Sequence, residues 1–343
     1  MELRREVFQG QMLLPDRDFA SSETSVEVRW DPLTRHAARL VRSPSPLFPP
    51  SGFDLEALAE QTELSCPFCP DRLERMTPMF PPAVWPEGRI RSGGAVGFPN
   101  LLPYAKHTAV SVYSPALHFL PLERMTPRLV ADNLACQVAF CAAVARHDPA
   151  ARWASVNANH MLPSGSSLFH PHLQGLAQPV PSTMQRLLAE VPAERFADYL
   201  DTERRVGARW LGGSGRVTWL ASFAPMGPCE LRAFVTGVAA PAELADDRDL
   251  VDELGWGIAT ALGLYAELGF QSFNLAIYGA PPGTTGYPLN LRMLCRSNLD
   301  APYRSDATLL ERLHWEAAVD ITPEALAERA GGRFRARSTR SRR

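Results

Sequence analysis

The chain has no excess of positive charge. Lysine and arginine number 35 against 37 aspartates and glutamates, which gives a formal net charge of −2. Six of the arginines lie in the last eleven residues, so the rest of the chain carries a net charge of −8. Proteins that bind nucleic acid usually carry a basic face. The charge balance therefore argues against nucleic acid as the main partner.

The chain also lacks long apolar runs. None approaches the roughly 20 residues of a membrane helix. Residues 1–6 lack the apolar segment of a secretory signal. We therefore expect no membrane partner and a cytoplasmic location, where the six cysteines would be thiols or metal ligands rather than disulfides.

The composition is that of a globular protein. Of 343 residues, 45% are hydrophobic and 21% are charged, and the length suits two domains. The 31 prolines predict few long helices.

A unit of helix, strand, loop and strand occurs twice in the sequence. In the first copy, Thr126 and Pro127 begin a helix that extends to about Arg146. A strand over 153–157, a loop and a strand with two histidines follow. The second copy has a helix over 250–268 ended by Gly269, strands over 272–278 and 289–294, and a glycine-rich loop between them. This order predicts an internal duplication, with its boundary near residues 178–182.

The histidine strand of the first copy is the most informative segment. His170, His172 and Gln174 stand at alternate positions after a loop of small residues. Alternate residues of a strand share one face, so the three polar groups would face one phosphate or one metal. A neutral imidazole is a good nucleophile toward phosphorus, which favours covalent phosphoryl or nucleotidyl transfer. A strand edge that carries two histidines by chance is the simpler alternative.

Cys66 and Cys69 form a Cys-x-x-Cys pair, whose spacing lets two thiolates bind one tetrahedral ion. The sequence has no second such pair, so the other ligands must be histidines or acids. The candidates are His107, His118, His160 and His170. A redox pair and two buried thiols are the alternatives.

Together these segments resemble the galactose-1-phosphate uridylyltransferase family of the histidine triad superfamily. The resemblance rests on landmarks in a fixed order over about residues 26–175: Arg29-Trp30-Asp31-Pro32-Leu33-Thr34, Cys66-Pro67-Phe68-Cys69, Phe98-Pro99-Asn100 with Pro103, Ser114-Pro115-Ala116-Leu117-His118, Asn159, Ser167, and His170-Pro171-His172-Leu173-Gln174.

The resemblance implies an α+β fold of two fused histidine-triad-like domains, each a mainly antiparallel sheet with a packed helix. The expected boundaries are 1–180 for a catalytic domain with a zinc site, 181–330 for a second domain without the histidine pair, and 331–343 for a disordered arginine-rich tail. Members are usually homodimers.

The resemblance also implies roles for individual residues. Zn²⁺ would be bound by Cys66, Cys69, His118 and His170. His172 would be the nucleophile, oriented by Asn159, and Gln174 and Ser167 would contact the transferred phosphoryl group. Asn100 and Arg29 are the expected nucleotide-binding residues.

The sequence departs from the family pattern on the acceptor side. Leu173 stands where the family has a small residue. Asn290 and Arg292 stand where uridylyltransferases carry a second histidine pair that belongs to another metal site. The C-terminal lysine and glutamine that contact the hexose phosphate have no clear match. Arg292 could grip a phosphate in their place, or form a salt bridge.

The resulting hypothesis is a nucleotidyltransferase. It would move a nucleoside monophosphate from a nucleotide sugar to a sugar phosphate or similar phosphate, through a nucleotidyl-histidine intermediate. The alternatives are a phosphorylase of the ADP-glucose phosphorylase kind that uses inorganic phosphate, and an inactive zinc-containing nucleotide-binding protein.

Overall fold

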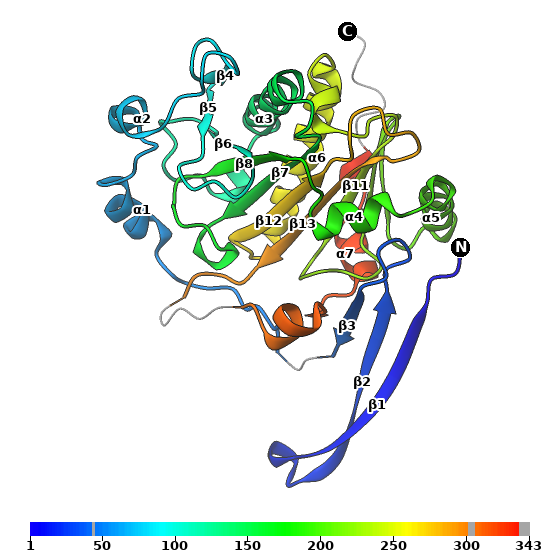
Figure 1. The fold of residues 1–343 in the computed structure, drawn as a ribbon. Coiled ribbons are helices and arrows are strands. Elements are labelled where there is room, and N and C mark those ends of the chain that lie inside the picture. Colours follow the sequence, from blue (N-terminus) through cyan, green and yellow to red (C-terminus); the bar gives the residue numbers. More distant parts are fainter. Residues whose placement is uncertain (43–44, 301–305, 336–343) are drawn as a thin grey trace.

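A ten-stranded antiparallel sheet forms the centre of the molecule (Figure 1). The computed structural model describes residues 1–42, 45–300 and 306–335. In spatial order the strands are β4 (Ile90–Ser92), β5 (Ala95–Pro99), β6 (His107–Val112), β8 (His172–Gln178), β7 (Trp153–His160), β12 (Ser272–Tyr278), β13 (Leu289–Arg296), β11 (Leu231–Val235), β10 (Val217–Ala221) and β9 (Trp210–Ser214).

The sheet consists of two five-stranded halves that meet where β7 pairs with β12. Each half contains one long helix, α3 (Pro127–His147) or α6 (Arg248–Glu267), placed between its third and fourth strands in chain order. The α+β class and the repeated helix–strand–strand unit are therefore confirmed. The domain boundary near residue 180 stays a prediction, because the sheet itself runs through both halves.

The two long helices pack on the same face of the sheet and against each other (Figure 1). A Cβ on Gly255 of α6 would lie 2.7 Å from the Cβ of Ala131 in α3, so glycine permits the close approach. α3 is apolar and long enough to cross a membrane by composition alone, but 72% of its apolar window is buried inside the structure. Together α3 and α6 thus form the centre of the hydrophobic core.

A smaller four-stranded sheet flanks the large one. Its order is β1 (Arg5–Leu14), β2 (Ala20–Trp30), β3 (Ala37–Val41) and β14 (Ala317–Val319). Figure 1 shows β1 and β2 as a long hairpin, the arm, that extends away from the rest of the molecule. The remaining helices are α1 (Leu55–Glu63), α2 (Pro70–Met76), α4 (Thr183–Ala189), α5 (Ala193–Val206) and α7 (Pro323–Ala330).

Two predictions about local structure were wrong. The histidine strand begins at His172, so His170 lies just before it and not within it. Residues 331–335 of the expected disordered tail are part of the fold, because Phe334 packs at 5.3 Å from the ring of Trp219 and is buried. The rest of the tail, 336–343, lies outside the described residues.

Candidate metal centre and active site

Four side chains predicted as metal ligands come together in the structure. The sulfur and nitrogen atoms of Cys66, Cys69, His118 and His170 all lie within 4.8 Å of one another. Nδ1 of His118 is 3.4 Å from Sγ of Cys69, and Nδ1 of His170 is 3.6 Å from Sγ of Cys66. Tetrahedral zinc, with bonds of about 2.0–2.3 Å, separates its ligand atoms by roughly 3.3–3.8 Å. The donor set and its spacing therefore fit a zinc ion.

The outer nitrogens of both histidines have partners that fix the rings. Nε2 of His118 lies 2.9 Å from Oγ1 of Thr62, whose hydroxyl already donates to a carbonyl of α1. Nε2 of His170 lies 3.0 Å from the carbonyl oxygen of Ser114. Each Nε2 therefore carries the proton, and each Nδ1 presents its lone pair to the cysteines. This is the arrangement in which metal-bound histidines are held in proteins.

The Cys69 thiol resists ionisation in these surroundings. Burial raises the pKa of the Cys69 thiol to about 12, and the neighbouring Cys66 adds to the increase. A divalent cation would stabilise the thiolates, which are the forms that bind metal.

His172 lies beside this cluster and is buried on the face of β8 opposite α3. Its Nδ1 lies 2.9 Å from the carbonyl oxygen of His170, and its Nε2 lies 3.2 Å from Nε2 of Gln174. A carbonyl only accepts, so Nδ1 carries the proton and Nε2 carries the lone pair. Burial lowers the pKa of His172, partly opposed by the bond to the His170 carbonyl. The Gln174 amide donates to this lone pair in the structure. A neutral ring with an unprotonated Nε2 is the nucleophilic form of histidine.

Two other residues predicted for the catalytic group lie in different surroundings. Asn159, expected to orient His172, instead accepts a hydrogen bond from Asn274 of β12 at 2.7 Å. The orienting partner of His172 is the His170 carbonyl. Ser167 is exposed in the loop before β8.

The two residues predicted to bind the nucleotide, Asn100 and Arg29, differ in their burial and in their hydrogen-bond partners. Asn100 follows β5, is half-buried, and caps the backbone of Leu102 at 3.1 Å. Arg29 is buried, and its guanidinium donates to Glu27 and to both carboxylate oxygens of Glu324. These donors hold α7 against β2, and a role of Arg29 in nucleotide binding stays a prediction.

The early Arg-x-Asp-Pro-Leu-Thr segment also has a structural role. Asp31 accepts from the backbone of Leu33 and Thr34 through one oxygen, and from Arg232 and Arg292 through the other. Arg292 also donates to Glu230 at 2.6 Å. We call Asp31, Glu230, Arg232 and Arg292 the buried ion cluster. Arg292 thus forms salt bridges, the alternative left open by the sequence.

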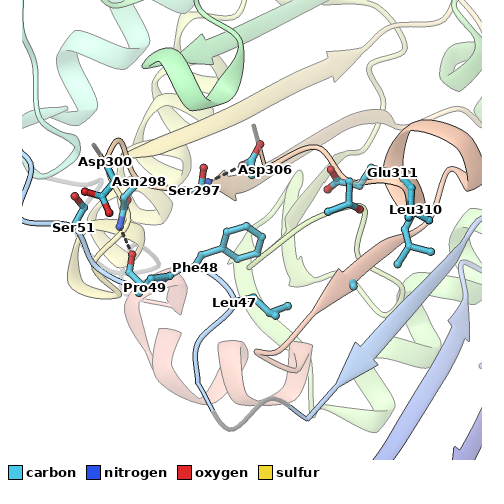
Figure 2. A pocket seen from close by; sticks show the side chains of 13 residues that line it. Leu47, Phe48, Pro49, Ser51, Ser297, Asn298, Asp300, Asp306, Leu310 and Glu311 are labelled. Atoms are coloured by element: carbon cyan, nitrogen blue, oxygen red, sulfur yellow. Dashed lines mark hydrogen bonds between the residues drawn. The ribbon is translucent and has the colours of Figure 1, made fainter. Parts of the chain in front are cut away.

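A large cavity lies away from these residues. It measures about 840 Å³ and is shown in Figure 2, where Leu47, Phe48 and Leu310 form its apolar wall. Among the described residues, none of those predicted to be catalytic or metal-binding lines it. A smaller cavity of about 390 Å³ contains Asn157 and Asn159 and extends over β12 and β13. The smaller cavity is therefore the better candidate for substrate, because it begins next to the Gln174 strand.

Comparison with known proteins identifies the fold. No family model matches the chain. An uncharacterised protein of Archaeoglobus fulgidus is 27% identical over 337 residues, which cover 96% of this chain and 97% of that protein.

Solved structures are similar over most of the chain. An ADP-glucose phosphorylase from Arabidopsis thaliana with bound ADP-glucose has a TM-score of 0.65 and 19% identity, and the match covers 89% of this chain and 98% of that one. A uridylyltransferase has a TM-score of 0.59 and 20% identity over 90% and 98% of the two chains. The chain therefore has the fold of the galactose-1-phosphate uridylyltransferase-like proteins, as its motifs predicted.

Proposed function

We propose that this protein is a nucleotidyltransferase that moves a nucleoside monophosphate from a nucleotide sugar to a sugar phosphate or a similar phosphate. The observation that carries the proposal is the state of His172. Its Nδ1 is committed to the His170 carbonyl, and its Nε2 lies next to the Gln174 amide. That geometry supports nucleophilic attack on phosphorus by Nε2.

The reaction proceeds in two displacements. In the first, the Nε2 lone pair attacks the α-phosphorus of the donor, and the bond from phosphorus to the bridging oxygen breaks, so that the sugar phosphate leaves with the electron pair. In the second, a phosphate oxygen of the acceptor attacks the same phosphorus, and the electron pair of the P–N bond returns to Nε2. A phosphate is a stable leaving group, so neither step needs a proton on the bridging oxygen.

The neighbouring residues are assigned supporting roles in this proposal. The Gln174 amide donates to a non-bridging phosphoryl oxygen, where charge increases during transfer. Ser167 contacts the same phosphoryl group, Asn159 borders it, and Asn100 contacts the nucleotide.

We propose zinc as the ion held by Cys66, Cys69, His118 and His170. When bound, it supplies a rigid cross-link between the α1–α2 segment and the start of β8. The His170 side chain would then be fixed, and its carbonyl holds the nucleophile. The metal thereby supports the position of His172.

A mass-spectrometric search for a nucleotide adduct tests the proposal. The protein is incubated with a panel of nucleoside diphosphate sugars, and its intact mass is measured. We expect an adduct whose mass identifies the nucleotide base. The adduct should be absent from His172→Asn and present in His147→Asn, which makes the same change at an exposed histidine. Turnover by His172→Asn at the wild-type rate would overturn the proposal.

The same experiment distinguishes the two alternative functions, a phosphorylase and a protein that only binds nucleotides. A phosphorylase would release the nucleotide from the adduct on addition of inorganic phosphate, and the similar ADP-glucose phosphorylase makes this alternative specific. A protein that only binds nucleotides would form no adduct with any donor.

We also propose that the protein is a cytoplasmic homodimer without nucleic-acid or membrane partners. The arm supports the dimer. Phe8, Met12 and Leu14 alternate on one face of β1 opposite Val26, Ser22 and Ala20 of β2, and Phe8 and Met12 are 54% and 47% exposed. A ten-residue ribbon face is roughly 34 Å by 10 Å. Two such faces amount to about 680 Å², so a stable dimer would bury further surface beside the arm.

A further inference from the structure

A third cavity lies outside the candidate active site. It measures about 480 Å³ and is bordered by the start of α1, by the residues that follow His118, by the end of β7 and by the end of α6. Among the described residues, neither His172 nor any of the four side chains of the metal cluster lines it. The roles proposed above therefore leave this cavity without a ligand.

The charged side chains that line this cavity are all acidic. Asp54 caps the N-terminus of α1, Glu56 lies in its first turn, and Glu123 comes from the segment beyond His118. All three residues are exposed, and within the described parts of the chain no lysine or arginine lines the cavity. A cleft bordered by one sign of charge concentrates ligands of the opposite sign. The carboxylates therefore favour a cationic ligand.

His160 is a buried polar side chain in the wall of the same cavity. It is only 4% exposed, and the centre of its ring lies 5.2 Å from that of Phe273, on which it stacks. Burial, with a further contribution from His172, lowers the pKa of His160 to about 3, so its ring is neutral at pH 7.

The ring of His160 also lacks a hydrogen-bond partner among the described residues. A neutral imidazole has one nitrogen that donates and one that accepts, and a buried polar group without a partner costs free energy. A ligand that donates a hydrogen bond to the unprotonated nitrogen of His160 would remove part of that cost. The buried end of the cavity therefore suits a ligand with a donor group.

The acceptors of this cavity are too far apart to hold one metal ion. In the described part of the chain, the metal cluster is the only group of three or more histidine, cysteine or acidic side chains whose ligand atoms lie within 4.8 Å of one another. A calcium or magnesium ion needs several oxygen ligands at about 2.0–2.6 Å. The spacing therefore favours an extended ligand that carries its positive charges apart.

Aromatic rings lie between the carboxylates and the histidine. Phe53 and Phe119 line the cavity and are half-buried, and Phe270 lines it and is buried. The face of a phenyl ring attracts an ammonium group, and its apolar surface packs against methylene groups. The wall thus suits a methylene chain with ammonium groups along it.

We propose that this cavity binds a linear polyamine. One terminal ammonium donates to the unprotonated nitrogen of His160, the methylene chain packs on the phenylalanine rings, and a second ammonium pairs with the exposed carboxylates of Glu56 and Glu123. The proposal does not depend on nucleotidyl transfer, because the cavity and its lining residues are separate from His172.

Isothermal titration of the full-length protein with putrescine and spermidine at physiological ionic strength tests the proposal. The diol 1,4-butanediol has the same chain as putrescine with hydroxyls in place of ammonium groups, so it reports binding without charge. Glu56→Gln combined with Glu123→Gln removes two carboxylates of the cavity. Glu60→Gln combined with Glu87→Gln is the matched control, since it removes the same charge at exposed glutamates that do not line the cavity.

We expect both amines to bind, spermidine more tightly, and the diol to bind far more weakly. The Glu56 and Glu123 variant should weaken spermidine binding about tenfold or more, as expected for two lost ion pairs of up to about 1 kcal/mol each, and the control variant should leave it unchanged. His160→Phe, which keeps an aromatic ring on Phe273, should weaken both amines.

Three results would overturn the polyamine site. They are the absence of binding by both amines, equal weakening by the two double variants, and binding of the diol as tight as that of putrescine. Unchanged affinity in a folded His160→Phe protein would exclude the contact assigned to His160. Folding of each variant is checked by its melting curve, and the two double variants change only exposed side chains.

Discussion

His170 joins the metal cluster to the candidate nucleophile through two of its groups. Its ring lies among the cysteines, and its carbonyl oxygen accepts from Nδ1 of His172. Phe68 lies between Cys66 and Cys69 in the sequence. The centre of its ring is 5.9 Å from that of His170 and 5.5 Å from that of His172. A change in the cluster should therefore reach the nucleophile without touching it.

Replacement of one ligand tests this connection. Cys66→Ser should bind far less zinc than one ion per chain, melt at a lower temperature, and form the nucleotide adduct more slowly. The reason is that a hydroxyl is a poor zinc ligand, and His170 then loses its anchor. Plasma mass spectrometry measures the zinc content, and a thermal melting curve measures the stability.

Cys141→Ser is the control for this variant, because Cys141 is equally buried but lies in α3. It should keep its full zinc content. A full complement of zinc in Cys66→Ser would contradict the ligand assignment.

The arm is the element that most needs a partner. An isolated two-stranded hairpin is marginally stable in water, and this hairpin exposes Phe8 and Met12 on one face. The opposite face carries Gln9 and Gln11 between the exposed Val7 and Leu13. Two pairs of glutamate substitutions in β1, one pair on each face, therefore test which face contacts a partner.

Phe8→Glu combined with Met12→Glu should convert a dimer into a monomer, since four carboxylates would enter a two-fold apolar contact. Gln9→Glu combined with Gln11→Glu, at two polar positions on the opposite face of the same strand, should leave the dimer intact. Size-exclusion chromatography with light scattering measures both. A monomeric wild type, or equal behaviour of the two double variants, would refute the role of the arm.

At the scale of the whole molecule, the buried ion cluster ties the start of the chain to the second half of the sheet. Burial would raise the pKa of Asp31, but the charges of Arg232 and Arg292 outweigh it and hold that pKa well below its usual range. The folded pKa is thus lower than the unfolded value of about 4. Asp31 therefore stabilises the fold above about pH 4, and this contribution is lost as the pH falls.

Asp31→Asn should lower the free energy of unfolding at pH 7 by about 3 kcal/mol or more, because it breaks a buried ion pair. The difference from wild type should be constant from pH 7 to about pH 4.5 and should shrink as the pH is lowered from there to about 2.5. Urea unfolding at several pH values measures it. Asp252→Asn, in the exposed pair with Arg248, should change stability by less than about 1 kcal/mol at any of them. A constant difference between Asp31→Asn and wild type across this range would exclude the assigned role of Asp31.

The sequence predicted the parts of the fold that depend on local patterns. The helix begun by Thr126 and Pro127 and the strand over 272–278 were both confirmed, since caps and periodicity lie within each segment. The candidate metal cluster was also predicted, because Cys66 and Cys69 are close in sequence and the resemblance supplied His118 and His170.

Other features depend on pairings that no local pattern contains. Asn274 bonds Asn159 across 115 residues, and Arg29 reaches Glu324 across 295. The arm strand β1 is stabilised by its partner β2, and Phe334 is ordered by Trp219. Each follows from how distant segments meet, so the partners of Asn159 and Arg29 could not be predicted from the sequence.

The pairing of β7 with β12 has a consequence for the evolution of such a chain. Antiparallel hydrogen bonds between residues 155–160 and 273–278 close the gap between the duplicated units. A single unit made alone would leave those backbone groups bare and prone to aggregate. Each half therefore depends on the other at this pairing, although the His-x-His pair stands in only one of them.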